Sequence, residues 1–429
     1  MKITSINIEN FKAIDSLHFN PHMLNIFVGR NNTGKTSILQ AIKLAFDRED
    51  YSDFFYSQPS AAIKYGENRV KLELKLAEDK RKKIELGIER VTMTVLISQL
   101  EKAVNEIFKR SLERIKDTNS KTPESDERKR RAVEIEKELK DWLNSEIILE
   151  LVDRDQLKKS IRESVNLIVN GEKNFLAGST IDSMARKLAF QIAEKLGITE
   201  FLGGEVSITT HFRRFTVFDD QHEDSFFSLY EKEMARKEKE NLSSPIFIID
   251  PIKSIDKVIS EGKRIEGTAH EIDKIIKEDK IISGLKRFNF NNLVFEGVED
   301  DVSMDSMGDG FKALIGILAS LYQQPKNTIV LIEEPEVHMH PGYLQELAKY
   351  LILLSRTRNI QLFISTHSME LINCFLDIDL MPPLNSDFVK SEFFMLRLNQ
   401  LENVVVSEEI DYNEADMAIK ELEWDLRGI

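Results

Sequence analysis

Cysteine, positive charge and long apolar runs are what this sequence has least of. Cys374 is the only cysteine among 429 residues, which excludes a disulfide framework and a zinc site built on cysteines. Acidic residues outnumber basic ones by 73 to 59, so the net charge of −14 creates no chain-wide attraction to nucleic acid or to an anionic membrane. No apolar run reaches the roughly 18 residues of a membrane span, and the opening MKITSINIEN lacks the apolar core of a signal peptide. We therefore expect a cytoplasmic protein that has no contact with membranes.

Strand-like patterns occupy both ends of the chain. Apolar residues alternate or cluster in residues 1–28, 69–77 and 83–97, which predicts strands and a small antiparallel lobe. Two later runs, NTIVLIEE and NIQLFIST, are apolar and rich in β-branched residues, as expected for central parallel strands that are covered on both faces. Hydrophobic residues make up 41% of the chain, enough for a large core, and the predicted fold class is α/β.

Between these strands the pattern changes to helical spacing near residue 98. One apolar stripe runs from Leu100 to Ile115 and a second from Ala132 to Leu143, with a charged segment between them, which predicts a helical hairpin. More helix is expected over residues 155–196 and 226–240. The expected division of the chain is residues 1–97, a mostly helical insertion at 98–243, and residues 244–429.

A phosphate-binding loop is the most specific motif. Residues 29–36, GRNNTGKT, match the pattern G-x-x-x-x-G-K-S/T after a predicted strand and before a predicted helix, so a chance glycine turn is disfavoured. The glycines let backbone N–H groups turn towards phosphate, and the helix N-terminus adds partial positive charge. We expect Lys35 to bind the β- and γ-phosphates and the Thr36 hydroxyl to ligate Mg²⁺. The predicted nucleotide-binding residues are Gly29, Asn31, Asn32, Thr33, Gly34, Lys35, Thr36 and Ser37.

An acidic strand end, LIEEPEVHMHP, lies at residues 331–341. In a protein with a phosphate-binding loop, the first acid, Glu333, is expected beside Mg²⁺, and the second, Glu334, is expected to polarise the attacking water. A zinc site that includes His338 and His340 is the alternative, but the sequence offers no cluster of further ligands. The two histidines fit better in a loop that meets another subunit.

Two weaker motifs complete the set. Ser306, Gly308 and Gly310 precede an apolar helical run, where they can face phosphate or act as ordinary helix caps. His367 follows the last apolar run and can hydrogen-bond a γ-phosphate or the attacking water, although a histidine there is commonly a plain loop residue. Glu334 and His367 are the predicted catalytic residues.

The order of these four motifs resembles that in ABC-type ATPases, in the group that contains the OLD family, the SMC-like proteins and RecF. The segments IENFKAI, SMGDGFKAL, EEPEVHMHP and STHS are most similar to OLD-type ATPases. The resemblance implies a P-loop ABC-type ATPase head that hydrolyses ATP with Mg²⁺. It also implies a homodimer or higher homo-oligomer, with ATP between the P-loop of one subunit and the serine and glycines of SMGDG in the other. Asp309 and Glu333 depart from the usual pattern, and Gln58 is a candidate for the glutamine loop.

The resemblance also suggests a biological role. Long-armed DNA-repair members carry a cysteine zinc hook, which this chain lacks, and the stretch after His367 is too short for a complete Toprim nuclease domain. We therefore expect a switch or sensor that acts through a partner effector, a nuclease or toxin encoded nearby, in prokaryotic anti-phage defence. The alternative is a RecF-like or SMC-like ATPase that repairs or clamps DNA. Nucleic acid could meet the basic stretches at 80–83, 128–131 and 213–214, although each is more typical of a solvated face.

Overall fold

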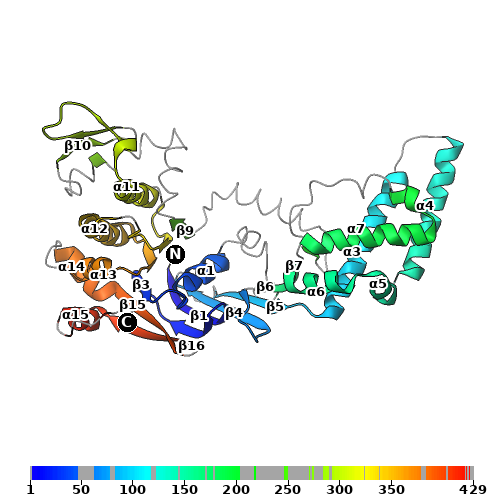
Figure 1. The fold of residues 1–429 in the computed structure, drawn as a ribbon, viewed down its shortest axis with the longest axis horizontal. Coiled ribbons are helices and arrows are strands. Elements are labelled where there is room, and N and C mark those ends of the chain that lie inside the picture. The colour runs from blue at the N-terminus through cyan, green and yellow to red at the C-terminus, as the bar shows by residue number, and fades with distance from the viewer. Residues whose placement is uncertain are drawn as a thin grey trace. The chain divides into compact units, whose positions relative to one another are not determined.

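The chain folds as two units in the computed structural model (Figure 1). The first unit comprises residues 1–47, 72–84 and 242–429, and the second comprises residues 48–71 and 85–241. The structure describes residues 2–46, 62–77, 83–116, 122–143, 145–169, 172–176, 179–202, 217–218, 246–249, 270, 273–274, 284–288, 292–322, 324–337, 339–377, 383–401, 404–420, 422 and 425. None of the helices in these ranges has the length and apolar character needed to cross a bilayer.

A six-stranded sheet forms the centre of the first unit, in the order β16-β15-β3-β14-β13-β9. β15, β3, β14, β13 and β9 run parallel, and β16 pairs antiparallel with β15. The strands are β3 (Leu24–Gly29), β9 (Ile246–Ile249), β13 (Ile329–Glu333), β14 (Gln361–Ser365), β15 (Phe393–Leu401) and β16 (Val404–Asp411). The two predicted central strands are β13 and β14, each with parallel neighbours on both sides. All their residues are buried except Glu333 at the end of β13, which confirms the prediction of central parallel strands covered on both faces.

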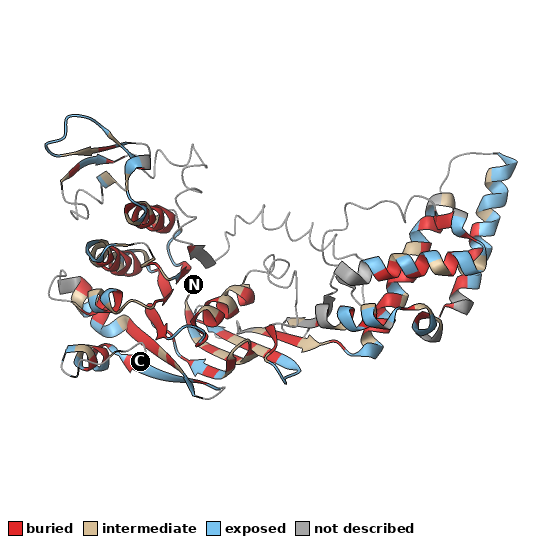
Figure 2. Ribbon diagram, in the orientation of Figure 1, coloured by how far each residue is buried: buried red, intermediate tan, exposed pale blue. Residues whose placement is uncertain are grey.

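Helices pack on this sheet through a continuous apolar core, which Figure 2 shows as buried strands and buried helix faces. The helices that share this core are α11 (Asp309–Tyr322), α12 (Pro341–Arg358), α13 (Met369–Leu376), α14 (Pro383–Glu392) and α15 (Tyr412–Lys420). α1 (Lys35–Phe46) also contacts the sheet, at β3, β13 and β14. α12 shows how the sequence fixes helix ends: Pro341 occupies the first turn, and Asn359 in the left-handed region (φ +54°) closes the helix. The predicted α/β architecture is confirmed.

Further strands accompany the central sheet in the first unit. β1 (Ile3–Phe11) and β2 (Ile14–Phe19) form an antiparallel hairpin, and β4 (Arg69–Leu76) is the neighbour of β1 on its other side. This pairing confirms the predicted antiparallel lobe. A three-stranded sheet of β10 (Leu285–Phe288), β11 (Asn292–Phe295) and β12 (Val302–Ser303) precedes a 3₁₀ turn and α11.

Helices dominate the second unit. They are α3 (Met93–Lys116), α4 (Pro123–Trp142), α5 (Ser145–Leu151), α6 (Arg154–Glu163) and α7 (Ser179–Leu196). The stripe residues Leu100, Val104, Ala132 and Ile135 are fully buried in one core, so the predicted helical hairpin of α3 and α4 is confirmed. Antiparallel strands in the order β5-β6-β7-β8 complete this unit: β5 (Lys83–Arg90), β6 (Val165–Val169), β7 (Glu172–Leu176) and β8 (Val217–Phe218).

Two sequence expectations for this unit were wrong. Residues 93–97 begin α3 instead of ending a strand, because Thr92 starts a helical turn in which Leu96 and Leu100 point into the core. Residues 165–169 and 172–176 pair as the antiparallel strands β6 and β7 instead of forming helix. Asn-Gly stands at 170–171 between two short apolar runs, and this dipeptide is the strongest short hairpin signal. The helix expected at 226–240 lies outside the described residues.

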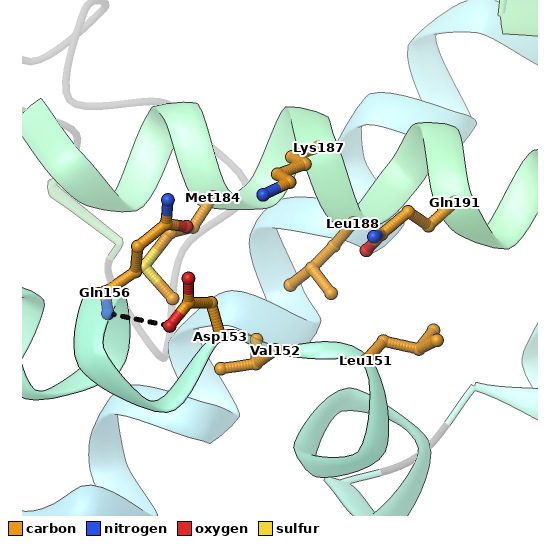
Figure 3. A pocket seen from close by; sticks show the side chains of 8 residues that line it. All are labelled: Leu151, Val152, Asp153, Gln156, Met184, Lys187, Leu188 and Gln191. Atoms are coloured by element: carbon orange, nitrogen blue, oxygen red, sulfur yellow. Dashed lines mark hydrogen bonds between the residues drawn. The ribbon is translucent and has the colours of Figure 1, made fainter.

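A cavity of about 220 Å³ lies between α6 and α7 (Figure 3). Its lining mixes apolar side chains with the polar groups of Asp153, Gln156, Lys187 and Gln191. The Asp153 carboxylate caps α6, where its Oδ1 accepts hydrogen bonds from the backbone N–H groups of Asp155 and Gln156 at 2.9 and 3.4 Å. Helix capping therefore accounts for the acid in this cavity.

Candidate functional site

The carboxyl ends of three parallel strands place the predicted motifs at one edge of the central sheet. Glu333 pairs in register with Ser365, and Ser365 with Phe27, so β13, β14 and β3 end at the same level. The phosphate-binding loop follows β3, the glutamates end β13, and His367 follows β14. Ligands of open α/β sheets bind at this edge, where loops leave the strands.

Glycine is required at both fixed positions of the phosphate-binding loop. Gly29 has φ +147°, and a Cβ placed there would lie 2.3 Å from the backbone oxygen of Leu398 on β15. Gly34 has φ +98°, and its Cβ would lie 3.3 Å from Ile14 Cγ1 on β2. The loop is therefore confined at these two positions, by β15 at Gly29 and by β2 at Gly34, where there is room for backbone only.

Lys35 is buried inside this loop, with 4% of its surface exposed. Its ammonium donates hydrogen bonds to the carbonyl oxygens of Gly29 and Arg30 at 2.7 and 2.9 Å. Burial lowers the pKa of Lys35 to about 8, and the nearby carboxylates of Glu334, Glu336 and Glu333 oppose this shift. A phosphate group beside the ammonium would add negative charge and stabilise the protonated form.

Thr36 and Glu333, the two predicted Mg²⁺ ligands, contact each other: the Thr36 hydroxyl donates a short hydrogen bond to Glu333 Oε1. A hydroxyl and a carboxylate are hard oxygen donors, which suit Mg²⁺. Across the described ranges, no group of three or more His, Cys, Asp or Glu residues is arranged to hold a metal ion. This donor set fits Mg²⁺ because that ion usually takes one or two protein oxygens and completes its shell with phosphate and water.

Glu334 and His367, the predicted catalytic pair, are in direct contact. His367 Nε2 lies 2.9 Å from Glu334 Oε1, and His367 Nδ1 lies 3.5 Å from the Lys35 ammonium. Glu334 adopts φ +45°, a conformation that side chains other than glycine seldom take, and its backbone N–H donates to the Ser365 oxygen at 2.9 Å. Such a strained residue at a strand end is typical of functional sites, where the surrounding structure holds it.

A sequence profile described as "AAA ATPase domain" matches residues 1–372, most of the chain. The chain belongs to this AAA ATPase domain family. A curated relative of this chain, an uncharacterized protein of Methanocaldococcus jannaschii, is 32% identical over 122 residues, which make up 28% of this chain and all of that protein (100%).

Solved structures with similar folds are SMC head domains. One from Thermotoga maritima matches with a TM-score of 0.44 and 11% identity, over 96% of this chain and 100% of that chain. A second, bound to the C-winged helix domain of ScpA, gives 0.46 and 10%, over 96% and 98%. A third, with an extended coiled coil and bound to the C-terminal domain of ScpA derived from Pyrococcus furiosus, gives 0.39 and 13%, over 98% and 99%.

Glu336 contacts this candidate site and is not among the residues predicted from the sequence. Its Oε1 accepts hydrogen bonds from the Thr366 hydroxyl at 2.6 Å and from the His367 backbone N–H at 2.7 Å. It is the third glutamate of EEPE, so the signal was present. The sequence does not show which residue Glu336 contacts, because Thr366 lies thirty residues away on the loop after β14.

Lys12 is a second residue of this site that the sequence reasoning missed. It lies on the β1–β2 turn with φ +54°, and its ammonium donates a short hydrogen bond to Gln40 Oε1 on α1. Burial lowers the pKa of Lys12, and the charge of Glu333 opposes that shift. A second cation therefore lies on the Glu333 side of the loop. Lys12 is the lysine of the segment IENFKAI, which supported the family resemblance but not a role in the site.

Ser306, Gly308 and Gly310 lie at the start of α11. The Ser306 hydroxyl donates to the Ser303 oxygen at 2.6 Å, and the Gly308 oxygen accepts from the N–H groups of Phe311 and Lys312. A Cβ at Gly308 would meet nothing within 4 Å. In the part of the chain that the structure describes, no hydrogen bond joins these residues to the phosphate-binding loop, so they form a separate surface of the AAA ATPase domain.

Other candidates from the sequence have ordinary structural roles or lie outside the described residues. His340 Nδ1 caps α12 by accepting from the Gly342 N–H at 3.2 Å. In the basic stretch on α4, Arg131 forms ion pairs with Glu134 and Glu138. His338, Gln58, residues 80–82 and residues 213–214 lie outside the described residues.

Proposed function

We propose that this chain hydrolyses ATP to ADP and phosphate with Mg²⁺ as its metal ion. The observation that carries the proposal is the line of contacts from Lys35 through His367 to Glu334, beside the Thr36–Glu333 pair. These side chains supply a cation, a base and oxygen ligands at one sheet edge. Phosphoryl transfer needs these groups in fixed positions.

In this proposal each side chain has one task. Lys35 binds the β- and γ-phosphates, and Thr36 and Glu333 would hold the metal ion, which neutralises charge on the phosphate oxygens when bound. Glu334 accepts a proton from water while the water oxygen bonds to the γ-phosphorus and the bond to the bridging oxygen breaks. His367 orients the Glu334 carboxylate and lies within reach of Lys35. The side chains of Glu334 and His367 are 37% and 30% exposed, so water can reach the base.

Phosphate release and nucleotide affinity test this assignment. Lys35→Ala should lose ATP binding because the buried cation is gone. Glu334→Gln should keep ATP affinity and lose about 10²- to 10⁴-fold in turnover, because the amide cannot accept the proton. Glu346→Ala is the matched control: this carboxylate pairs with Lys349 on α12 and should leave both quantities unchanged. Normal turnover by Glu334→Gln would refute the role of Glu334.

We further propose that a second copy of the chain completes the site. The start of α11 supports this, because Gly308 is open to approach and a helix N-terminus attracts phosphate. In such a dimer, the surface formed by Ser306, Gly308 and Gly310 would meet the ATP held by the partner's phosphate-binding loop. ATP should therefore shift the chain from monomer to dimer in light scattering, and ADP should not.

The biological role that we propose is that of a switch acting through a partner effector, a nuclease or toxin, in prokaryotic anti-phage defence. Its support is the similarity of four segments to OLD-type ATPases. The test is to express the chain with and without the gene beside its own and to count phage plaques. Protection should need both genes and should disappear in Lys35→Ala. Equal plaque numbers in all strains would remove this role and would leave the proposed hydrolysis untouched.

A further inference from the structure

Several contacts join the loops that follow β13 and β14. The backbone N–H of Glu334 donates to the Ser365 oxygen at 2.9 Å. Two residues further along each loop, the Glu336 carboxylate accepts from the His367 backbone N–H at 2.7 Å. The third join is the contact at 2.9 Å between the side chains of Glu334 and His367. The first two contacts hold the backbone of each loop in place. The contact between the Glu334 and His367 side chains depends on that backbone arrangement.

Glu336 makes a further bond that spreads this link along the second loop. The same oxygen, Oε1, accepts from the Thr366 hydroxyl at 2.6 Å, and Thr366 Oγ1 in turn accepts from the Ser368 N–H at 3.0 Å. The Ser368 hydroxyl accepts from the Leu371 N–H and so caps α13. One carboxylate oxygen therefore binds two consecutive residues of the turn between β14 and α13, Thr366 and His367.

We propose that Glu336 is a positioning residue that holds His367 at the distance from Glu334 needed for turnover, an inference that rests on the proposed hydrolysis. His367 has a rotatable side chain, and its backbone is fixed from the first loop by Glu336. Without that carboxylate, the backbone N–H and the Thr366 hydroxyl lose their acceptor. The imidazole then samples other positions, and the Glu334 carboxylate loses its hydrogen-bonding partner.

The chemistry favours a long side chain with an oxygen at this position. Aspartate is shorter by one methylene and would withdraw the oxygen from both donors. Glutamine keeps an oxygen that can accept both bonds. The amide nitrogen of glutamine would take the place of Glu336 Oε2. That oxygen is buried without a hydrogen-bond partner among the described residues, so replacing it breaks no hydrogen bond. Glutamine should therefore rescue most of what alanine loses.

The experiment is a double-mutant cycle on turnover. We would measure kcat by phosphate release and ATP affinity by fluorescence of a labelled ATP analogue for Glu336→Ala, His367→Ala and the double variant. Glu336→Ala should lower kcat about 10- to 100-fold, the range typical of groups that orient a functional side chain, and change affinity less than about threefold. In the His367→Ala background, Glu336→Ala should lower kcat by less than about twofold, because the effect of Glu336 on turnover passes through His367.

Two further variants keep the result interpretable. Glu336→Gln should recover kcat to within about fivefold of wild type by keeping the acceptor. Thr366→Val removes one of the two donors at nearly constant volume and should give a smaller loss. If Glu336→Ala does not fold, the cycle is run with Thr366→Val. Glu346→Ala again serves as the control carboxylate.

The outcomes separate this inference from the proposed hydrolysis. Wild-type kcat in Glu336→Ala, or an equal loss with and without His367, overturns the positioning role. Loss of kcat in His367→Ala without loss in Glu336→Ala overturns the positioning role alone and leaves hydrolysis standing. Wild-type kcat in His367→Ala overturns both the positioning role and the catalytic role of His367.

Discussion

The depressed pKa of Lys35 makes ATP binding depend on pH in an unusual range. Burial lowers this pKa from 10.5 to about 8, so the free site starts to lose its cation above that value. Bound phosphate favours the charged form, which places the pKa of the complex higher. Affinity for ATP should therefore be highest well below pH 8 and fall as pH rises through it, by up to about tenfold for each pH unit above it.

The size of the effect follows from the fraction of Lys35 that is protonated. Between pH 7.5 and 9.0 the protonated fraction falls about eightfold for a pKa near 8, which corresponds to about 1.3 kcal/mol of binding free energy. Phosphate groups titrate near pH 6, so the charge of ATP stays constant across this window. The expected result is an eightfold rise in Kd from pH 7.5 to 9.0.

Calorimetry or a fluorescent ATP analogue at constant ionic strength would measure this change. Lys35→Arg is the matched control, because a guanidinium stays protonated throughout. Its Kd should be higher and independent of pH. A wild-type Kd that did not change between pH 7.5 and 9.0 would refute the reasoning, as would the same slope in Lys35→Arg.

Three other predictions concern assembly, the loop and the second unit. Lys35→Ala and Ser306→Arg should each abolish turnover, and a mixture should regain part of it, because a mixed dimer has one site free of both lesions; proven heterodimers without activity would count against the shared site. Gly29→Ala should lower Tm and cost at least tenfold in ATP affinity, since its Cβ meets the Leu398 oxygen at 2.3 Å, whereas Gly308→Ala should keep Tm. Ile135→Ala, fully buried in the second unit, should cost about 2–5 kcal/mol of unfolding free energy. Its neighbour Val133→Ala, 56% exposed, should cost under about 0.5 kcal/mol.

The sequence was a good guide wherever a pattern is local. The phosphate-binding loop depends on a few consecutive residues, and the central strands show as unbroken apolar runs, so both were predicted in place. The prediction of helix over residues 165–176 was wrong because a short apolar run fits a helix and a strand equally well. The Asn-Gly pair at 170–171 favours a hairpin and did not enter that prediction. His340 illustrates the same limit for a site, because its capping of α12 depends on the bond to the Gly342 N–H.

Glu336 shows why part of the site could not be read in advance. Its role depends on a hydroxyl and an N–H thirty residues later, which come close only because β13 and β14 pair in register. Sequence spacing carries no information about that pairing. Lys12 is similar, because the hairpin that holds it lies against the phosphate-binding loop through Ile14 and Gly34.

The position of β15 has a consequence for how the protein is made. β3 carries the phosphate-binding loop and lies between β14 and β15, and Gly29 is in register with Leu398. The loop near the start of the chain thus gains its walls only from residues synthesised long after it. On the ribosome, a nascent chain that ends before β15 has β3 without one neighbour and Gly29 without the carbonyl that confines it. The loop can therefore take up the conformation that we propose for nucleotide binding only after Leu398 has been synthesised. ATP binding would then report that β15 has paired with β3.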